Sequence, residues 1–225
     1  MNGGVAIFVK TPGRSALKTR LAADRGEAYA SGWYRRAAAA VASVARQAQA
    51  RHGLVAYWAV AEADARDAWP DLPTLAQGAG GLGERMARVH AQLVERHGFG
   101  LLLGADSPQL TAELLGEAMD WLAASAPRLL LGPASDGGFW IFGGNHALPV
   151  VRWTGVAYST ADTAARLRDS LCDAGDWRTL PTLTDVDHAS DLPAVRDALQ
   201  RLQNPTPEQR ALAAWMDRHE DSPHA

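Results

Sequence analysis

Three segments of the chain carry charged side chains directly after short apolar runs. The first is a cationic stretch from Lys10 to Arg20, and the other two hold Asp106 and Asp136. In open parallel sheets, ligands bind beyond the carboxyl ends of the strands. We therefore expect a cationic loop and two acidic loops at one edge of a sheet.

The cationic stretch contains Lys10, Arg14, Lys18 and Arg20, and no acid occurs before Asp24. Cations this close repel one another unless an anion lies among them, and phosphate oxygens are natural partners through charge-assisted hydrogen bonds. The stretch is not a Walker A motif, because a leucine precedes the lysine where a glycine is expected. A phosphate-binding loop is favoured over a solvated run of charges.

Asp106 stands between an apolar run and Pro108. An ionised aspartate is costly to bury without a partner, and Mg²⁺ usually takes one or two carboxylates together with substrate phosphates. The alternative is a turn or helix-capping acid, which is weakened because Thr111 already suits the cap of the next helix. Asp106 is therefore a candidate metal ligand.

The remaining acids are less specific. The sequence Asp136-Gly137-Gly138 is a common turn pattern. Asp185 and Asp187 come late in the chain and fit turn chemistry and metal binding equally well. The pattern alone leaves both interpretations open.

Residues Gly78–Gly83 match the letters of a GxGxxG motif. A dinucleotide fingerprint should follow a strand, and Pro70–Gln77 does not have a strand pattern, so a Rossmann cofactor site is not expected. The loop could still bring backbone amides to a nucleotide, while Glu84 and Arg85 fit a cap and a surface ion pair equally well.

Other enzyme classes find little support. The seven histidines form no HExxH motif and no zinc spacing, no Gly-x-Ser-x-Gly elbow occurs, and the single cysteine, Cys172, falls within a predicted helix. The eight tryptophans are more typical of packing, with Trp140 and Trp153 near the predicted site.

The composition is that of a folded protein, with 225 residues, 47% hydrophobic and 21% charged. The net charge of −3 provides no overall positive field that would attract nucleic acid. No apolar run approaches the length needed to span a membrane. One cysteine allows a reducing compartment, and the opening apolar run is too short for a signal peptide. We expect a cytoplasmic protein, with no nucleic-acid partner; a homo-oligomer is compatible with the sequence.

Apolar runs alternate with amphipathic stretches, which predicts a mostly parallel α/β sheet covered on both faces. Strands are expected at 5–9, 54–60, 100–103, 128–131 and 138–142, and helices at 27–51, 82–97, 111–124, 159–173, 190–203 and from Thr206. Residues 1–203 are predicted to form one domain, and residues 204–225 a C-terminal helix with a frayed tail from Asp217.

The order of these motifs resembles the DUF2064 family, glycosyltransferase A-like proteins of the nucleotide-diphospho-sugar transferase superfamily. The resemblance spans Val5 to Leu199. It is carried by Phe8-Val-Lys10, Lys18-Thr-Arg-Leu21, Gln77-Gly, Leu82-Gly-Glu-Arg-Met86, Gly104-Ala-Asp-Ser-Pro108, Gly132-Pro with Asp136-Gly-Gly138, Ser159-Thr160, and Asp185-Val-Asp187 with Asp191-Leu192.

The resemblance implies a GT-A-like, Rossmann-like sheet sandwiched by helices, and kinship with guanylyltransferases. It further implies that the loop after the first strand holds nucleotide phosphates and that Asp106 and Asp187 hold Mg²⁺ or Mn²⁺. Two features depart from the pattern. Pro108 replaces the second acid of the usual DxD, and the loop is poorer in glycine than in nucleotidyltransferases.

Residues and resemblance together predict a set of site residues. Lys18, Arg20 and Asp106 are the expected catalytic residues. The nucleotide is expected at Lys10, Thr11, Pro12, Gly13, Arg14, Lys18, Arg20, Gln77, Gly78, Gly83 and Arg85. The acceptor is expected at Asp136, Gly137, Gly138, Ser159 and Thr160, and the metal at Asp106 and Asp187.

The predicted function is metal-dependent transfer from a nucleotide-sugar to a small acceptor. One alternative is a nucleotidyltransferase that couples a nucleoside triphosphate to a phosphorylated acceptor and releases pyrophosphate. A non-catalytic nucleotide-binding module and a metal-dependent phosphohydrolase are the others. The phosphohydrolase is disfavoured because no second carboxylate lies beside Asp106 in the sequence.

Overall fold

The computed structural model of the protein describes residues 3–219. These residues form one seven-stranded sheet in the order β3-β2-β1-β4-β6-β5-β7. Strand β6 is antiparallel to both of its neighbours, and all other pairs are parallel. The strands are β1 (Gly4–Val9), β2 (Val55–Val60), β3 (Thr74–Ala76), β4 (Gly100–Gly104), β5 (Arg128–Pro133), β6 (Phe139–Gly144) and β7 (Asp176–Thr179). The predicted mostly parallel sheet is confirmed.

Strand β1 lies inside the sheet and is covered on both faces, which explains its unbroken apolar sequence. Side chains alternate along a strand. Val5, Ile7 and Val9 accordingly join one hydrophobic cluster, while Ala6 joins the other, with Phe8 packed against it.

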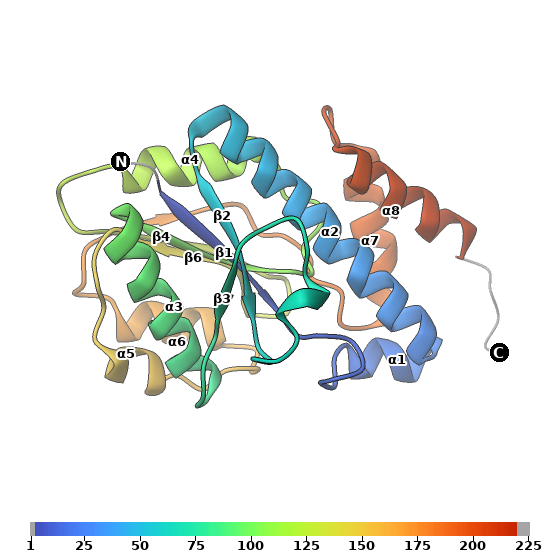
Figure 1. The fold of residues 1–225 in the computed structure, drawn as a ribbon, viewed down its shortest axis with the longest axis horizontal. Coiled ribbons are helices and arrows are strands. Elements are labelled where there is room, and N and C mark those ends of the chain that lie inside the picture. The colour runs from blue at the N-terminus through green and yellow to red at the C-terminus, as the bar shows by residue number, and fades with distance from the viewer. Residues whose placement is uncertain (1–2, 220–225) are drawn as a thin grey trace.

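The helices form the two outer layers (Figure 1). One layer packs on the cluster that contains Val5 and comprises α2 (Glu27–His52), α4 (Ala112–Leu122), α7 (Leu192–Gln200) and α8 (Pro207–Arg218). The other comprises α3 (Leu82–His97), α5 (Val150–Thr154) and α6 (Thr163–Ser170). The short α1 (Thr19–Arg25) packs on α2, and 3₁₀ helices occupy Arg66–Ala68 and Ala189–Asp191.

Several predicted helix boundaries are confirmed. Thr111 caps α4 by accepting a hydrogen bond from the Leu114 backbone, and Thr206 caps α8 in a capping box with Gln209. The helix predicted from residue 159 begins only at Thr163. Ser159 has a left-handed backbone, with φ of 62°, which a helix interior does not allow.

The sequence also missed four short elements, namely α1, β3, α5 and β7. The expectation that Pro70–Gln77 contains no strand is wrong, because Thr74–Ala76 pairs with the end of β2. This strand has three residues at the sheet edge, directly after Pro73, so it is too short to show a periodic pattern.

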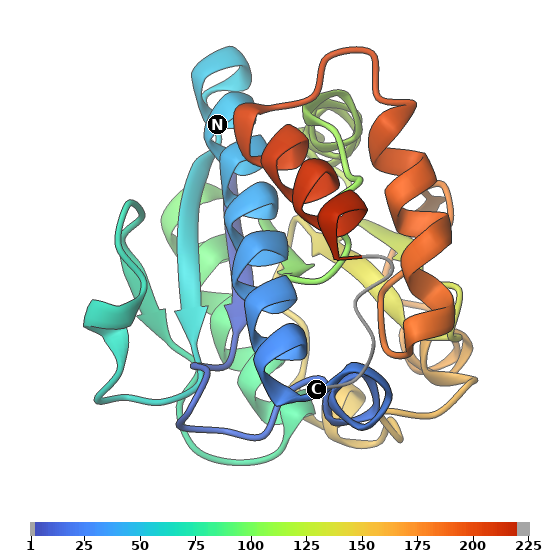
Figure 2. The same ribbon diagram turned by 90° about the vertical axis from the view of Figure 1, so that its right-hand side faces the viewer.

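Helix α8 is attached to the sheet domain. It lies beside α2 and α7 (Figure 2). The Thr206 hydroxyl is 2.7 Å from that of Ser43 in α2, and the buried Gln209 amide donates to the carbonyl oxygens of Pro108 and Leu110. Gln209 thereby fixes the loop that carries Asp106. Of the predicted frayed tail, residues 220–225 lie outside the described residues.

Within residues 3–219, no helix is both long enough and apolar enough to span a membrane.

Candidate active site

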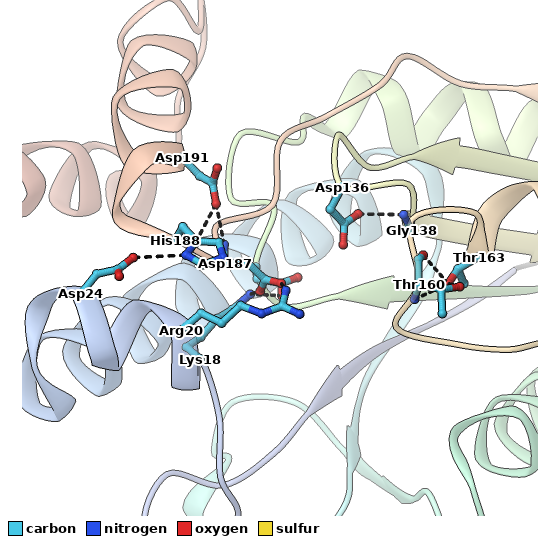
Figure 3. Close-up of polar contacts among 11 residues, drawn as sticks. Lys18, Arg20, Asp24, Asp136, Gly138, Thr160, Thr163, Asp187, His188 and Asp191 are labelled. Carbon is cyan, nitrogen blue, oxygen red and sulfur yellow. Dashed lines mark hydrogen bonds and ion pairs between the residues drawn. The ribbon is translucent and has the colours of Figure 1, made fainter.

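The loops after β1 and β4 meet a late segment of the chain at one point (Figure 3). The Lys18 ammonium lies 2.6 Å from an Asp106 oxygen and 3.0 Å from an Asp187 oxygen. Arg20 reaches the second Asp187 oxygen at 3.0 Å. The structure therefore brings Lys18 and Arg20 of the cationic loop together with Asp106 and Asp187.

Local backbone geometry places Lys18 in this position. Lys18 has a left-handed conformation, with φ of 45° and ψ of 43°, and directly precedes α1. A lysine is uncommon there, and such strained residues cluster at functional sites. The neighbouring Leu17 packs against the core, and the ammonium lies 6.0 Å from the centre of the buried Trp33 ring. The side chain is thus held under the loop, with only 7% of it exposed.

The two carboxylates keep the buried Lys18 charged. Burial alone would lower the pKa of Lys18, but the charges of Asp106 and Asp187 outweigh burial and raise that pKa well above its ordinary value. Burial would raise the pKa of Asp187, but Lys18, followed by Arg20, lowers it overall. The site therefore contains a positive charge held between two carboxylate groups.

A group of three carboxylates adjoins this ion pair. One carboxylate oxygen from each of Asp136, Asp185 and Asp187 lies within 4.8 Å of the others. One Asp185 oxygen is buried without a hydrogen-bond partner in the described structure. Burial, followed by the charges of Asp106 and Asp136, raises the pKa of Asp185 to about 7. Oxygen donors of this kind suit Mg²⁺ or Mn²⁺, so the three residues fit a divalent metal.

The carboxylates that lie close enough to bind one metal differ from the predicted pair, Asp106 and Asp187. Asp187 belongs to the group of three, whereas Asp106 forms an ion pair with Lys18. A metal shared by Asp106 and Asp187 would have to take the place of the ammonium between them. For Asp185 the sequence favours neither a turn nor a metal site, because no pattern shows that its loop passes close to Asp136.

Two cavities open at this site. The first, which we call the cation-lined cavity, has a volume of about 380 Å³ and is bordered by Lys10, Lys18, Tyr34 and Gln77. The second, which we call the acid-lined cavity, measures about 280 Å³ and is bordered by Asp136 and Asp185. Both are bordered by Phe8, Leu82, Gly104, Asp106 and Ser159. Asp106 thus lies in the wall that the two cavities share.

Some of the residues predicted to bind the nucleotide border the cation-lined cavity, and others do not. Lys10, Lys18 and Gln77 border it, and Arg20 is joined to it through Asp187. Arg14 instead pairs with Asp64 at 3.3 Å and borders neither cavity.

Glu62 explains why the start of the loop turns away. Its carboxylate accepts the Thr11 backbone N–H at 2.9 Å and the Ser15 hydroxyl. The Thr11 hydroxyl accepts the indole N–H of Trp69. Thr11 and Pro12 therefore border a separate cavity behind the loop, and the adjoining Gly13 borders none of those described here.

The glycine-rich loop has packing roles. The Gly81 backbone N–H donates to Glu84, and the Arg85 side chain donates to the Gly80 carbonyl oxygen. A side chain at Gly83 would collide with the Trp153 carbonyl oxygen, and one at Gly78 with Arg88. Gly78, Gly83 and Arg85 do not border either cavity.

Four of the five predicted acceptor residues border the acid-lined cavity, namely Asp136, Gly138, Ser159 and Thr160. Gly137 does not. It forms the turn with φ of 88° that lets Asp136 accept the Gly138 backbone N–H at 2.7 Å. Thr160 is tied to Thr163 and Asp162 through its hydroxyl.

Sequence reasoning missed two residues of the site. Tyr34 is buried in α2, and its hydroxyl accepts the Lys10 backbone N–H at 3.1 Å. Ser107 borders the acid-lined cavity with a buried hydroxyl that has no partner within the described structure. Ser107 follows Asp106 directly and could have been suspected. Of the two tryptophans singled out earlier, Trp140 borders the acid-lined cavity and Trp153 belongs to the core.

Solved structures share this architecture. A predicted nucleotide-diphospho-sugar transferase from Desulfovibrio desulfuricans G20 is 25% identical, with a TM-score of 0.82 over 97% of this chain and 96% of that one. CMP:2-keto-3-deoxy-manno-octonic acid synthetase in complex with CTP is 13% identical, with a TM-score of 0.51 over 90% and 100% of the two chains. The 4-diphosphocytidyl-2C-methyl-D-erythritol synthase of Anaerococcus prevotii DSM 20548 is 10% identical, with a TM-score of 0.52 over 89% and 97%.

Fold and similarity together define the protein as a transferase with a GT-A-like fold. The chain belongs to the DUF2064 family, described as uncharacterized proteins conserved in bacteria, whose model matches residues 39–160. No curated protein matches the sequence.

Proposed function

We propose that the protein transfers a sugar from a nucleotide-diphospho-sugar to an acceptor hydroxyl in a reaction that needs Mg²⁺ or Mn²⁺. The observation that carries the proposal is the position of Lys18. Its ammonium lies against Asp106, which separates a cation-lined cavity from an acid-lined one. A donor in the first cavity and an acceptor in the second would react across that wall.

The cations of the first cavity suit the leaving group. When the bond between the anomeric carbon and the diphosphate breaks, its electron pair passes to the diphosphate, and charge builds on the phosphate oxygens. Lys10, Lys18 and Arg20 are placed to neutralise that charge, and preorganised charges of this type supply much of the catalysis in such transfers. The acceptor oxygen forms the new bond to the anomeric carbon and passes its proton to the Asp106 carboxylate, which borders both cavities.

Asp136, Asp185 and Asp187 would hold the divalent metal. A bound metal supplies charge neutralisation and orientation to the diphosphate. Asp187 would connect the metal to the cationic residues, because it also contacts Lys18 and Arg20. The residues proposed for catalysis are therefore Lys18, Arg20 and Asp106.

Similarity supports a sugar rather than a nucleotidyl group as the transferred unit. The Desulfovibrio protein, which matches almost the full chain, is named for nucleotide-diphospho-sugar transfer. With Arg14 paired to Asp64, the cations that remain at the site are Lys10, Lys18 and Arg20.

The test is a two-stage assay. A thermal-shift screen of nucleoside diphosphates and nucleotide-sugars, with and without Mg²⁺, identifies the donor; a ligand at one hundred times its Kd should stabilise the protein by about 2.7 kcal/mol. Incubation of that donor with small hydroxyl compounds should then release the nucleoside diphosphate. Pyrophosphate release from a nucleoside triphosphate would instead identify a nucleotidyltransferase. Tight nucleotide binding without any turnover would identify a binding module.

A further inference from the structure

The acid-lined cavity has a composition that restricts the acceptor. Among the described residues that border it there is no lysine, arginine or histidine, whereas Asp106, Asp136 and Asp185 all border it. Resting on the transferase function proposed above, we propose that the acceptor is an uncharged or cationic hydroxyl compound with an apolar part, and that phosphorylated acceptors are excluded.

The charges in this cavity are not balanced by neighbouring cations. Asp106 is paired with Lys18, but within residues 3–219 neither Asp136 nor Asp185 has an ion-pair partner. Asp187 also contacts Lys18 and Arg20, so a divalent metal held with Asp136 and Asp185 would balance those two carboxylates without leaving a positive surplus. With that metal engaged by the donor diphosphate, a phosphate group on the acceptor would find no cationic side chain at the cavity border. It would lie instead beside the carboxylates of Asp106, Asp136 and Asp185 in a partly enclosed space, where repulsion is stronger than in water.

The walls of the cavity supply the apolar contacts. Leu82, Met86, Phe139 and Tyr158 border it. Aromatic and aliphatic side chains around a few polar groups are typical of sites for small molecules. The acceptor should thus carry a ring or an alkyl group beside its reactive hydroxyl.

Ser107 is an independent sign that a polar ligand group enters this cavity. The residue is 1% exposed and borders the cavity, and its hydroxyl has no hydrogen-bond partner in the described structure. Buried hydroxyls are seldom left unpaired, because each unmade hydrogen bond is costly. A hydroxyl of the acceptor is able to both donate to and accept from Ser107.

The decisive experiment compares matched ligands that differ only in a phosphate. Phenyl β-glucoside and 2-phenylpropane-1,3-diol would each be titrated by calorimetry, alongside their monophosphates, which keep a free hydroxyl, into the full chain with Mg²⁺ and a saturating nucleoside diphosphate. The neutral member of each pair should bind at least about tenfold more tightly. Equal or tighter binding of the phosphate esters, or no binding of either neutral compound, would overturn the proposal.

A charge-insertion pair tests the electrostatic reason. Leu82→Lys adds a cation at the cavity border, where Leu82 is 45% exposed and substitution should not disturb folding. Val151→Lys adds the same charge on α5, away from both cavities, and serves as the control. Leu82→Lys alone should increase the affinity for the phosphate esters about tenfold. The reasoning would be contradicted if Val151→Lys had an equal effect. It would also be contradicted if Leu82→Lys left the ratio of the affinities for the neutral and phosphorylated compounds unchanged.

These results remain separable from failure of the proposed function. If no nucleoside diphosphate stabilises the protein and no nucleotide-sugar is turned over, the transferase proposal fails. The same titrations without nucleotide would then still measure whether the cavity prefers neutral over phosphorylated ligands.

Discussion

Replacing Lys18 by methionine removes the charge that joins the two acidic segments while leaving a side chain of similar length. Asp106 and Asp187 would face each other without their cation. Loss of one partner from a buried ion pair costs about 3–5 kcal/mol, and exposed pairs contribute about 0–1 kcal/mol. Because the two carboxylates are 28% and 32% exposed, we expect an intermediate loss of about 2 kcal/mol in the free energy of unfolding.

For a chain of this size, that loss corresponds to a decrease of about 4–8 °C in Tm. The proposed sugar transfer should decrease by about 100-fold or more, as is typical when one preorganised charge at a leaving group is removed. Urea unfolding and initial rates of nucleoside diphosphate release measure the two effects. Arg14→Met is the matched control, because Arg14 belongs to the same loop but pairs with the exposed Asp64.

The stability loss should depend on pH in a defined way. Lys18 lowers the pKa of Asp187, so the stabilisation from this pair is present above the ordinary aspartate pKa of about 3.9 and is lost as the pH falls below it. The raised pKa of Lys18 keeps the stabilisation complete up to about pH 10. Wild type and Lys18→Met should differ fully at pH 7 and much less at pH 3. Equal stability of the two proteins at pH 7, or equal activity losses in Arg14→Met, would refute the reasoning.

Three further predictions concern the surrounding residues. Because the pKa of Asp185 is raised to about 7, the metal-free protein should lose stability as the pH rises from about 4 to 7. In urea unfolding with a chelator present, Asp185→Asn should be more stable than wild type by about 1–3 kcal/mol at pH 8, and the two proteins should be equally stable at pH 4. Added Mn²⁺ should raise the Tm of wild type but not of Asp136→Asn; an equal rise would exclude Asp136 as a ligand. Gly137→Ala should lower the free energy of unfolding by about 2 kcal/mol or more, because Gly137 has φ of 88° and a Cβ there would overlap the Ala161 carbonyl oxygen. Gly32→Ala within α2 should instead raise it by about 0.5–1 kcal/mol, and chemical denaturation of both variants measures the contrast.

The sheet was predictable because its strands are buried on both faces. A run such as Val5–Val9 has no polar interruption, and long helices such as α2 and α3 show regular apolar spacing. The short elements were not predictable. β3 and β7 are edge strands whose pairing depends on a neighbour rather than on their own pattern.

The meeting of Lys18 with Asp106 was predictable from the parallel sheet. Lys18 and Asp106 follow neighbouring parallel strands, β1 and β4, whose carboxyl ends must meet. The pairing of Arg14 with Asp64 was not predictable, since Asp64 lies in an irregular segment after β2. The meeting of Asp136 with Asp185 likewise depends on a late loop with no periodic pattern.

The most direct test of the account is a crystal structure of the protein with a nucleoside diphosphate and Mn²⁺. We predict diphosphate oxygens within hydrogen-bonding distance of the Lys18 ammonium, and an anomalous manganese peak at Asp136, Asp185 and Asp187. A nucleotide bound elsewhere on the molecule, with Lys18 still enclosed by Asp106 and Asp187 and no metal beside them, would contradict the account.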